Sequence, residues 1–312
     1  MNHSDYGLID PDCCSQIDVS QITNVTFNEY AGYLSILNLN VRGLRSNFTL
    51  LKGFLSVIHM IPKIIVITES HLEDNEVNHF NLNGYRQSFT NRSRLGGGIM
   101  VYIHHSLDYS INDKFSGVFN SHESLFFTLK LPCNKKIDFL CIYRPPNNDM
   151  TEFTQFLRSI PDRVYRGGCV IVGDLNKCPT RDISTSHYID MKNFLNGKQF
   201  RQLVKYPTFF SYNASPSILD HVWTNTNFTS HCFVFTTPVA DHVPSVTFLK
   251  VSAKLPNVRL RFRDFSKLNI SYLCETFHDK FDSFYRELFF NCLSLNQKFK
   301  FLTQWLEAAC EF

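Results

Sequence analysis

Carboxylate or amide side chains follow apolar, strand-like runs at several places in this sequence. The places are Leu39-Asn40, Ile67-Thr68-Glu69, Val172-Gly173-Asp174-Leu175-Asn176, Leu219-Asp220-His221 and Ala240-Asp241-His242. Because acidic residues at strand ends converge at one edge of a sheet, we expect them to share a cleft, where their repulsion is costly unless a divalent cation compensates it. Oxygen-rich sites of this kind suit Mg²⁺ or Mn²⁺. The pattern therefore predicts a divalent-metal site.

Each of these residues also has a structural interpretation. A single Asp is more often a helix cap or a turn residue, and a single His such as His242 is more often a satisfied structural histidine. Tyr143 alone is more often a packing residue at a strand end. The recurrence of the same context, and the place of His242 directly after Asp241 and before a buried strand, favour chemistry. His71, His104 and His105 have no assigned partner, and we interpret them as structural.

Alternating strand and helix patterns predict the elements that must position these groups. Apolar runs indicate strands over residues 33–39, 64–67, 85–89, 98–104, 125–131, 137–143, 169–172, 217–223 and 246–251. One helix is expected after a cap at Ser46, with an apolar face from Leu50 to Ile58, and a short helix after Asp149. Repeated strands with intervening helices predict two packed sheets with helices outside.

The two ends of the chain differ from its middle. Residues 1–32 are predicted to form a weakly structured leader, and residues 33–250 a single domain. The stretch from Lys254 to Phe265 is basic and contains proline, and apolar residues then recur at helical spacing. Residues 251–312 are therefore predicted to be a basic linker with a helical appendage.

Composition excludes some classes of protein. The 312 residues are 44% hydrophobic with a net charge of +3, which suits a globular core and does not by itself indicate a nucleic-acid binder. Basic residues nevertheless gather locally, for example at Arg42 and Arg45. The 10 cysteines include no C-x-x-C pair, and we see neither a signal peptide nor an apolar run of membrane-spanning length. We expect a soluble intracellular monomer with reduced thiols and no membrane association.

The order of the motifs resembles the endonuclease/exonuclease/phosphatase family. The chain most resembles the apurinic-type endonuclease domain of non-LTR retrotransposons of the jockey and chicken-repeat kind. The resemblance covers roughly residues 33–250 and rests on the sequences at 39–44, 67–72, 143–146, 173–176, 218–222 and 240–242. Each short motif is a weak signal, but their order and spacing make a strong one. The resemblance implies an α/β (α+β) fold of the DNase I type, a four-layer sandwich of two packed β-sheets flanked by helices, with the C-terminal helical appendage added.

Two further segments resemble the retrotransposon branch. Residues 206–211 (Tyr-Pro-Thr-Phe-Phe-Ser) do so within the domain, and residues 262–265 (Phe-Arg-Asp-Phe) resemble the linker that precedes a reverse transcriptase. No reverse transcriptase sequence follows, so the chain resembles a severed or domesticated fragment of such an element.

The resemblance also implies roles for individual residues. Glu69 would bind the metal, with Asn40 beside it, and Asp241 would support the metal or the histidine. Asp174 would orient or deprotonate the attacking water, which Asn176 would help to hold. His242 would donate to the phosphate with Asp220 fixing its ring, and Tyr143 would donate a hydrogen bond to the same group. The candidates for DNA contact are Arg42, Arg92, Arg94, Arg144, Thr208 and Ser211.

Two positions depart from the family's pattern. Relatives often carry Asp or Asn where this chain has Arg42, and Ser where it has Ala240. The first change removes an oxygen ligand, which weakens metal binding or supplies a phosphate contact instead. The second removes a hydroxyl, at a cost of about 1 kcal/mol for one hydrogen bond. Full catalytic competence is therefore a separate question from the fold.

The implied function is a Mg²⁺-dependent DNA endonuclease, with Mn²⁺ able to substitute. It would leave a 3′ hydroxyl and a 5′ phosphate and nick target DNA for retrotransposition. The expected partners are DNA and, outside this chain, a reverse transcriptase domain and element RNA, and the expected location is the nucleus. Cleavage preference would lie in the loops at 91–97 and 208–217. The alternatives are a weakened or inactive DNA-binding remnant, and an abasic-site or other phosphoester hydrolase of the same family.

Overall fold

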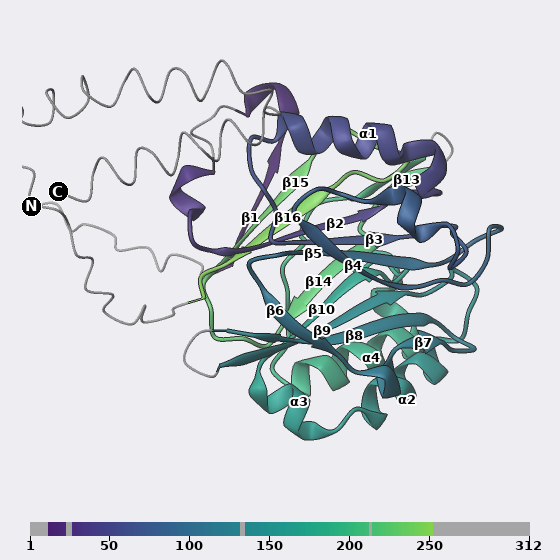
Figure 1. Ribbon diagram of the computed structural model, residues 1–312. Coiled ribbons are helices and arrows are strands. Elements are labelled where there is room, and N and C mark those ends of the chain that lie inside the picture. Colours follow the sequence, from purple (N-terminus) through teal and green to yellow (C-terminus); the bar gives the residue numbers. More distant parts are fainter. Residues whose placement is uncertain (1–11, 23–26, 132–134, 212–213, 252–312) are drawn as a thin grey trace, which may run out of the picture. The chain divides into compact units, whose positions relative to one another are not determined.

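The computed structural model describes residues 12–22, 27–131, 135–211 and 214–251. Two β-sheets pack face to face, and helices cover the outer face of each (Figure 1). The four-layer sandwich predicted from the sequence is therefore confirmed. The predicted appendage at 252–312 lies outside the described residues.

The first sheet contains strands from the N-terminal and C-terminal parts of the described chain. In spatial order its strands are β1 (Asp12–Ile17), β15 (Ser230–Phe235), β16 (Ser245–Leu249), β2 (Leu34–Asn40), β3 (Ile64–Thr68), β5 (Ile99–His104) and β4 (Tyr85–Thr90). The neighbours β2 and β3 are parallel, whereas β16 runs antiparallel to β2. The two parallel strands therefore end at the edge where β16 begins.

The second sheet comes mainly from the middle of the chain. Its order is β11 (Arg201–Gln202), β14 (Asp220–Thr224), β10 (Cys169–Asp174), β9 (Lys136–Tyr143), β8 (Glu123–Lys130) and β6 (Asp108–Ile111), and β7 (Gly117–Val118) also pairs with β8. A separate hairpin is formed by β12 (Phe209–Ser211) and β13 (Ala214–Ser217). Since β9 and β10 are parallel and β14 is antiparallel to β10, two strand ends and one strand start share an edge.

The helices follow the predicted positions only in part. They are α1 (Leu44–Val57), α2 (Met150–Ser159), α3 (Asp162–Gly167) and α4 (Ser186–Gly197). The 3-10 turns are η1 (Val19–Gln21), η2 (Asn28–Tyr30), η3 (Val77–Phe80), η4 (Asp113–Phe115) and η6 (Asp182–Ser184). As predicted, Asp149 caps α2 by accepting a hydrogen bond from Thr151 N at 2.7 Å. The expected cap at Ser46 is wrong, because α1 starts directly after Gly43.

Three apolar layers hold the sandwich together. Ile36 and Val66 of the first sheet pack against Phe139 and Val172 of the second in the central layer. On the outside of the first sheet Leu37 and Leu39 lie under α1, while α2 and α4 cover the second sheet. Because both faces of β2, β3 and β10 are covered, every residue of these strands is buried. This explains the uninterrupted apolar runs in the sequence.

The structure differs from the predicted boundaries at two places that matter for the site. β1 pairs in parallel with β15, so the first sheet begins inside the segment predicted to be a leader. The single strand expected over 217–223 is two elements, because β13 ends at Ser217 and β14 starts at Asp220. Asp220 therefore begins a strand rather than ending one.

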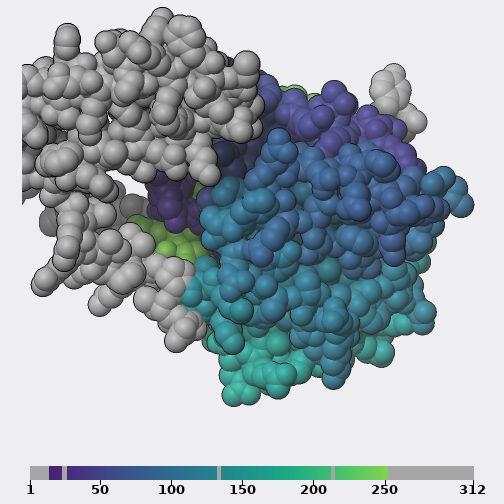
Figure 2. All heavy atoms as spheres, in the orientation of Figure 1, coloured from purple at the N-terminus to yellow at the C-terminus, as the bar shows by residue number. Residues whose placement is uncertain are grey.

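The edge strands β4 and β6 of the two sheets lie on the same side of the sandwich. Figure 2 shows this side covered mainly by the blue middle segment of the chain.

Cys141 and Cys169, which lie in apolar runs, are buried thiols. Within the described ranges, no helix is long and apolar enough to cross a membrane.

Candidate active site

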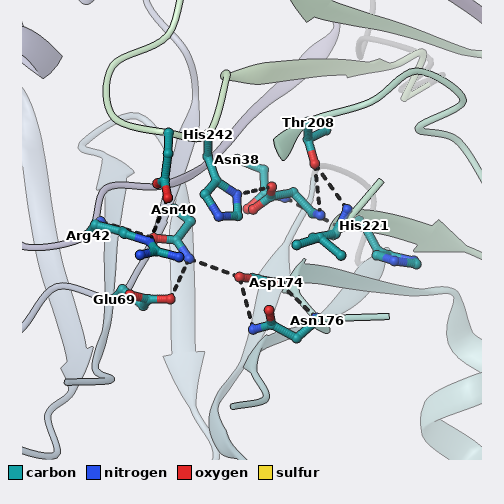
Figure 3. Close-up of polar contacts among 12 residues, drawn as sticks. Asn38, Asn40, Arg42, Glu69, Asp174, Asn176, Thr208, His221 and His242 are labelled. Carbon is teal, nitrogen blue, oxygen red and sulfur yellow. Dashed lines mark hydrogen bonds and ion pairs between the residues drawn. The ribbon is translucent and has the colours of Figure 1, made fainter. Parts of the chain in front are cut away.

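The candidate site lies at the edge of the sandwich where strand ends of the two sheets meet (Figure 3). β2 ends at Asn40 and β10 ends at Asp174. β14 begins at the same edge with Asp220, which is in register with Asp174. His242 shortly precedes β16, which runs antiparallel to β2. Residues far apart in sequence are brought together because parallel strands end where their antiparallel neighbours start.

The backbone turns sharply where it leaves these strands. Arg42, Glu69, His71 and Asn176 all have positive φ values, of 43°, 52°, 52° and 48°. This left-handed conformation is uncommon for residues other than glycine and costs about 1–3 kcal/mol each. Such strained residues gather at functional sites. The strand-end turns are therefore held in place by the contacts described next.

Asn40 lies at the centre of the site and links two carboxylates. Its Nδ2 donates to Glu69 Oε1 at 2.8 Å and to Asp174 Oδ2 at 2.9 Å. The Arg42 backbone N–H, which can only donate, lies 3.0 Å from Asn40 Oδ1 and so fixes the orientation of the amide. In this arrangement the amide nitrogen faces the carboxylates. Asn40 thus positions Glu69 and Asp174, and its expected place beside the metal stays a prediction.

Asp174 is fully buried and is held by Asn176 as well as Asn40. Asn176 donates its backbone N–H to Asp174 Oδ1 at 2.8 Å and its Nδ2 to Oδ2 at 3.2 Å. Burial and the neighbouring charge of Asp220 raise the pKa of Asp174 to about 7, against the lowering influence of His242 and Asn40. A carboxylate with such a pKa can accept a proton near neutral pH.

His242 and Asp220 form a buried pair. His242 Nδ1 lies 2.6 Å from Asp220 Oδ2, and both side chains are almost fully buried. Burial lowers the pKa of His242, but the charge and hydrogen bond of Asp220, together with the charges of Asp174 and Asp241, raise it to about 9. His242 is therefore a cation at neutral pH and can donate from Nε2.

The two Asp-His dipeptides of the sequence thus have different roles. His221, next to Asp220, faces away: its Nε2 donates to Lys177 O at 2.7 Å and its Nδ1 accepts from Trp223 Nε1 at 3.1 Å. Burial lowers the pKa of His221 to about 4. It is a neutral structural histidine, and the residue that pairs with Asp220 is His242.

Glu69 receives more support than the sequence indicated. His71 Nε2 lies 3.3 Å from Glu69 Oε2. Burial raises the pKa of Glu69, but hydrogen bonds from His71 and Asn40 and the charge of Arg42 lower it to about 2. No partner of His71 was predicted from the sequence. The signal that could have indicated one is its spacing, since His71 stands two residues after Glu69.

Tyr143 ends β9 in register with Asp174 and is buried at the same edge. Burial, together with the charges of Glu69 and Asp174, raises the pKa of its hydroxyl well above the usual range. Tyr143 therefore keeps its proton and can act only as a hydrogen-bond donor or acceptor in its neutral form.

Arg42 introduces a cation into this acidic edge. Its Nε lies 2.9 Å from Asp241 Oδ2, and its guanidinium carbon lies 5.9 Å from the centre of the Phe209 ring. The Arg42 side chain is 52% exposed. Phe209 also packs on His242, with ring centres 4.9 Å apart. Asp241 Oδ2 thus pairs with Arg42, while its Oδ1 has no hydrogen-bond partner among the described residues, so its expected role beside the metal stays a prediction.

Two of the expected DNA contacts are buried and have structural roles. Arg144 is fully buried, and its guanidinium donates to the backbone oxygens of Leu175, Asn148 and Asn176. Thr208 is also fully buried, and its hydroxyl accepts hydrogen bonds from Asp220 N at 3.0 Å and Leu219 N at 3.2 Å. Arg144 therefore supports the turn after β10, and Thr208 holds the start of β14. Neither side chain can reach DNA.

The other candidates for DNA contact are on the surface. Ser211 is exposed in the β12–β13 hairpin. Arg92 pairs with Glu123 at 3.2 Å, and Arg94 pairs with Glu73 at 3.3 Å and Glu76 at 3.0 Å. Both arginines are 40% or more exposed. These positions can still meet a phosphate, although each arginine would exchange a carboxylate partner for it.

The carboxylates present fit a divalent cation. Asp174, Asp220 and His242 offer ligand atoms that all lie within 4.8 Å of one another. Asp220 Oδ1 is buried without a hydrogen-bond partner among the described residues. The imidazolium of His242 disfavours a cation at its own nitrogen. The oxygens of Asp174 and Glu69, which are joined through Asn40, are the better match for Mg²⁺.

Part of this sequence also matches a known family. Residues 137–246 match the family described as "Endonuclease-reverse transcriptase". No curated protein gives a significant match to the sequence. The family match covers β9 to β16 and so includes Tyr143, Asp174, Asp220 and His242.

Solved structures of nucleases share the fold. The endonuclease domain of TRAS1, a telomere-specific non-LTR retrotransposon, is 13% identical with a TM-score of 0.54, over 70% of this chain and 99% of that one. The catalytic domain of Xenopus laevis APE2 is 15% identical with a TM-score of 0.52, over 69% of this chain and 91% of its own. An AP endonuclease from Archaeoglobus fulgidus is 16% identical with a TM-score of 0.50, over 70% of this chain and 100% of that one.

The motif order, the two-sheet architecture and these similarities agree. The chain has the DNase I-like fold of the endonuclease/exonuclease/phosphatase proteins, and its residues 137–246 match the endonuclease–reverse transcriptase family within it.

Proposed function

We propose that this chain is a divalent-metal-dependent DNA endonuclease that nicks target DNA for retrotransposition. The observation that carries the proposal is the buried His242–Asp220 pair, which lies beside Asp174 and Glu69 at one edge of the sandwich. A cationic donor, a carboxylate with a pKa near neutrality and a metal-ready carboxylate are the groups needed for phosphodiester hydrolysis. The match to the endonuclease–reverse transcriptase family supports the choice of DNA as substrate.

Each residue of the candidate site has a separate role in the proposed reaction. Asp174, held by Asn40 and Asn176, takes a proton from a water molecule as its oxygen bonds to phosphorus. The bond from phosphorus to the 3′ oxygen breaks, and that oxygen takes a proton from solvent water, to give a 3′ hydroxyl and a 5′ phosphate. His242 donates to a phosphate oxygen as negative charge grows, and Tyr143 donates a second hydrogen bond. Glu69 and Asp174 would hold Mg²⁺, and the ion would supply positive charge for the same phosphate.

Arg42 has a distinct part in this proposal. Its Nε pairs with Asp241, and its guanidinium lies near the Phe209 ring. The side chain is half-exposed beside the site, and a guanidinium suits a phosphate oxygen. Arg42 would thus grip the DNA backbone at a position where related nucleases carry an oxygen ligand.

Plasmid nicking tests the proposal directly. Purified protein should convert supercoiled plasmid to the nicked circle in Mg²⁺ or Mn²⁺ and not in excess chelator. Asp174→Ala and His242→Ala should each lower the rate at least about 100-fold, because each removes a group that acts on the reacting atoms. Asp190→Asn, which alters a surface ion pair on α4, should leave the rate unchanged. Folded wild-type protein that leaves plasmid intact in both metals would contradict the enzyme assignment.

A second candidate is a weakened or inactive DNA-binding remnant. The Arg42–Asp241 pair favours it, because it places a cation and a neutralised carboxylate where metal ligation is expected. Binding of duplex DNA without cleavage would support the remnant. Parallel assays on an abasic duplex and a small phosphomonoester separate both candidates from a repair nuclease or a general phosphoesterase. We also propose that the chain acts together with a reverse transcriptase domain and element RNA, both outside this chain. Its proposed location is the nucleus.

A further inference from the structure

Glu123 is a buried carboxylate that none of the motifs contains. It begins β8 in the second sheet, and its side chain is 1% exposed. An ionised carboxylate is almost never buried this deeply unless it has specific partners. Its strand neighbour across the β8–β9 pair is Tyr143, so Glu123 lies at the same edge as the candidate active site.

The first partner of Glu123 is a glycine turn in the other sheet. Glu123 Oε2 accepts a hydrogen bond from Gly98 N, just before β5. A Cβ atom at Gly97 would overlap the Glu123 carboxylate, and one at Gly98 would overlap Ser70 Oγ. Both glycines also have positive φ, of 75° and 92°. Glycine is therefore required here by the close approach of Glu123 on one side and Ser70 on the other.

The Gly97–Gly98 turn also holds the segment that carries Glu69. Ser70 N donates to Gly98 O at 3.1 Å, and His71 N donates to Gly97 O at 2.9 Å. Ser70 and His71 directly follow Glu69, and His71 Nε2 contacts its carboxylate at 3.3 Å. An unbroken series of contacts thus runs from Glu123 in the second sheet to Glu69 in the first.

The second partner of Glu123 is a surface arginine. Arg92 Nη1 lies 3.2 Å from Glu123 Oε1, and the Arg92 side chain is 40% exposed. Glu123 therefore joins a half-exposed cation, a glycine turn and the Glu69 segment. Its Oε2 accepts a hydrogen bond from the glycine turn, while its Oε1 lies near Arg92 and has no hydrogen-bond partner among the described residues.

We propose that Glu123 is a positioning residue for the nuclease: it holds the Gly97–Gly98 turn from the opposite sheet and thereby sets the position of Glu69 and His71. The inference rests on the proposed function for its catalytic consequence. The structural part of the inference does not rest on the proposed function. The contacts predict that particular backbone amides are protected from hydrogen exchange, whatever the substrate is.

Glu123→Gln is the central variant, since it keeps the shape of the side chain and removes its charge. Asp138→Asn is a matched control: Asp138 is a half-buried carboxylate on β9 that accepts a hydrogen bond from Thr128, near the opposite end of the same strand pair. Arg92→Ala removes the cation and leaves the glycine turn. Glu123→Asp keeps the charge and replaces the Gln variant if that protein does not fold.

Hydrogen exchange gives the readout that does not depend on activity. Glu123→Gln should speed exchange of the Ser70 and His71 amides about tenfold or more, while amides of the central strands stay protected. Asp138→Asn should leave the Ser70 and His71 amides as in the wild type. Unchanged exchange in a folded Glu123 variant would overturn the inference, and so would equal acceleration in Asp138→Asn.

Metal binding and kinetics give the functional readout. Glu123→Gln should weaken Mn²⁺ binding, measured by titration calorimetry, and lower kcat for nicking about 10- to 100-fold, as a small misplacement of a reacting group does. KM should change less than about threefold, since Glu123 does not touch DNA. Arg92→Ala should instead raise KM. A kcat loss in Arg92→Ala equal to that in Glu123→Gln would show that the arginine and not the turn carries the effect. If the wild type does not nick, the proposed function fails, while the exchange and Mn²⁺ comparisons still decide the role of Glu123.

Discussion

His242 and Asp174 have pKa values moved toward the range in which an endonuclease must work. Burial and the charge of Asp220 raise that of Asp174 to about 7, so this carboxyl loses its proton as the pH rises through about 7. The charges around His242 raise its pKa to about 9 in spite of its burial, so it loses its proton as the pH rises through about 9. The active form, with Asp174 charged and His242 protonated, is therefore most populated between these values.

A bell-shaped pH profile of kcat/KM for nicking is the expected result, with its limbs near pH 7 and pH 9. Because a bound cation favours the charged form of Asp174, higher Mg²⁺ should move the acidic limb to lower pH. Asp220→Asn removes the charge that most raises the pKa of His242, so the alkaline limb should move to lower pH. An alkaline limb that stays in place in Asp220→Asn would show that another group controls it.

Arg42 is one of the two residues at which the sequence departs from the pattern of the family that it resembles. Arg42→Ala should weaken binding of duplex DNA and raise KM about tenfold, the effect of one hydrogen bond to a charged group. Arg42→Asp should lose this contact and gain an oxygen ligand, so Mn²⁺ should bind more tightly in calorimetry. Arg86→Ala is the matched control, since Arg86 donates to Leu107 O and lies over Tyr109. Unchanged DNA binding in Arg42→Ala would remove Arg42 from the substrate site.

Residue types at strand ends were sufficient to select most of the site, and burial explains what they missed. Asn40, Glu69, Asp174 and His242 could be chosen because polar residues after apolar runs are conspicuous. Arg144 could not be excluded from DNA contact, because only the fold shows that three backbone oxygens surround it. Side-chain type alone does not distinguish an exposed arginine from one that holds a turn.

At the scale of elements, the bend at the end of β10 decides where Asp174 points. Gly173 has φ of 137°, and a Cβ atom there would overlap the backbone oxygen of Ile142 in β9. The close approach of these strands is what allows Asp174 to stand in register with both Tyr143 and Asp220. Glycine is thus required immediately before Asp174.

Gly173→Ala should destabilise the protein by about 1–3 kcal/mol and reduce nicking, because the strand must shift to admit the added methyl group. Urea denaturation gives the stability, and plasmid nicking gives the activity. Gly53→Ala in α1 should have the opposite effect on stability, a gain of about 0.5–1 kcal/mol, because a Cβ atom there meets nothing within 4 Å. Equal stability of the two variants would contradict this role of Gly173.

The strand β15 (Ser230–Phe235) and the helices α3 and α4 were not predicted, and several other unpredicted elements are short, polar or dependent on partners. β6, β7 and β11 are too short for a periodic pattern, and β12 consists of Phe209–Ser211 in what was expected to be a loop. β1 exists because it pairs with β15, more than 200 residues later in the chain. Such pairing is set by the tertiary fold, so local sequence does not reveal it.

At the scale of the whole molecule, the domain begins earlier than residue 33. Tyr30 is buried and stacks on Phe248 with ring centres 4.4 Å apart, and Phe27 packs on Phe233. β1 covers the otherwise open edge of β15. An uncovered strand edge offers unpaired backbone groups to other chains.

A chain that starts at Tyr33 should therefore melt at a lower temperature than the full chain and aggregate more readily. Differential scanning calorimetry and light scattering would measure both effects. A chain that starts at Asp12 serves as the control, since it keeps β1, η1 and η2. Equal melting temperatures for the chains starting at Tyr33 and Asp12 would show that the domain boundary predicted from the sequence is sufficient.

Two contacts of the site cross between the two sheets: Asn40 donates to Asp174, and His242 pairs with Asp220. The strand that follows His242, β16, is the last described strand in the chain, yet it lies inside the first sheet between β15 and β2. The pair therefore cannot form until nearly the whole domain has been synthesised and its sheets have docked. If the chain is the nuclease proposed above, a nascent chain without β16 lacks this pair and would not cut DNA until folding is complete.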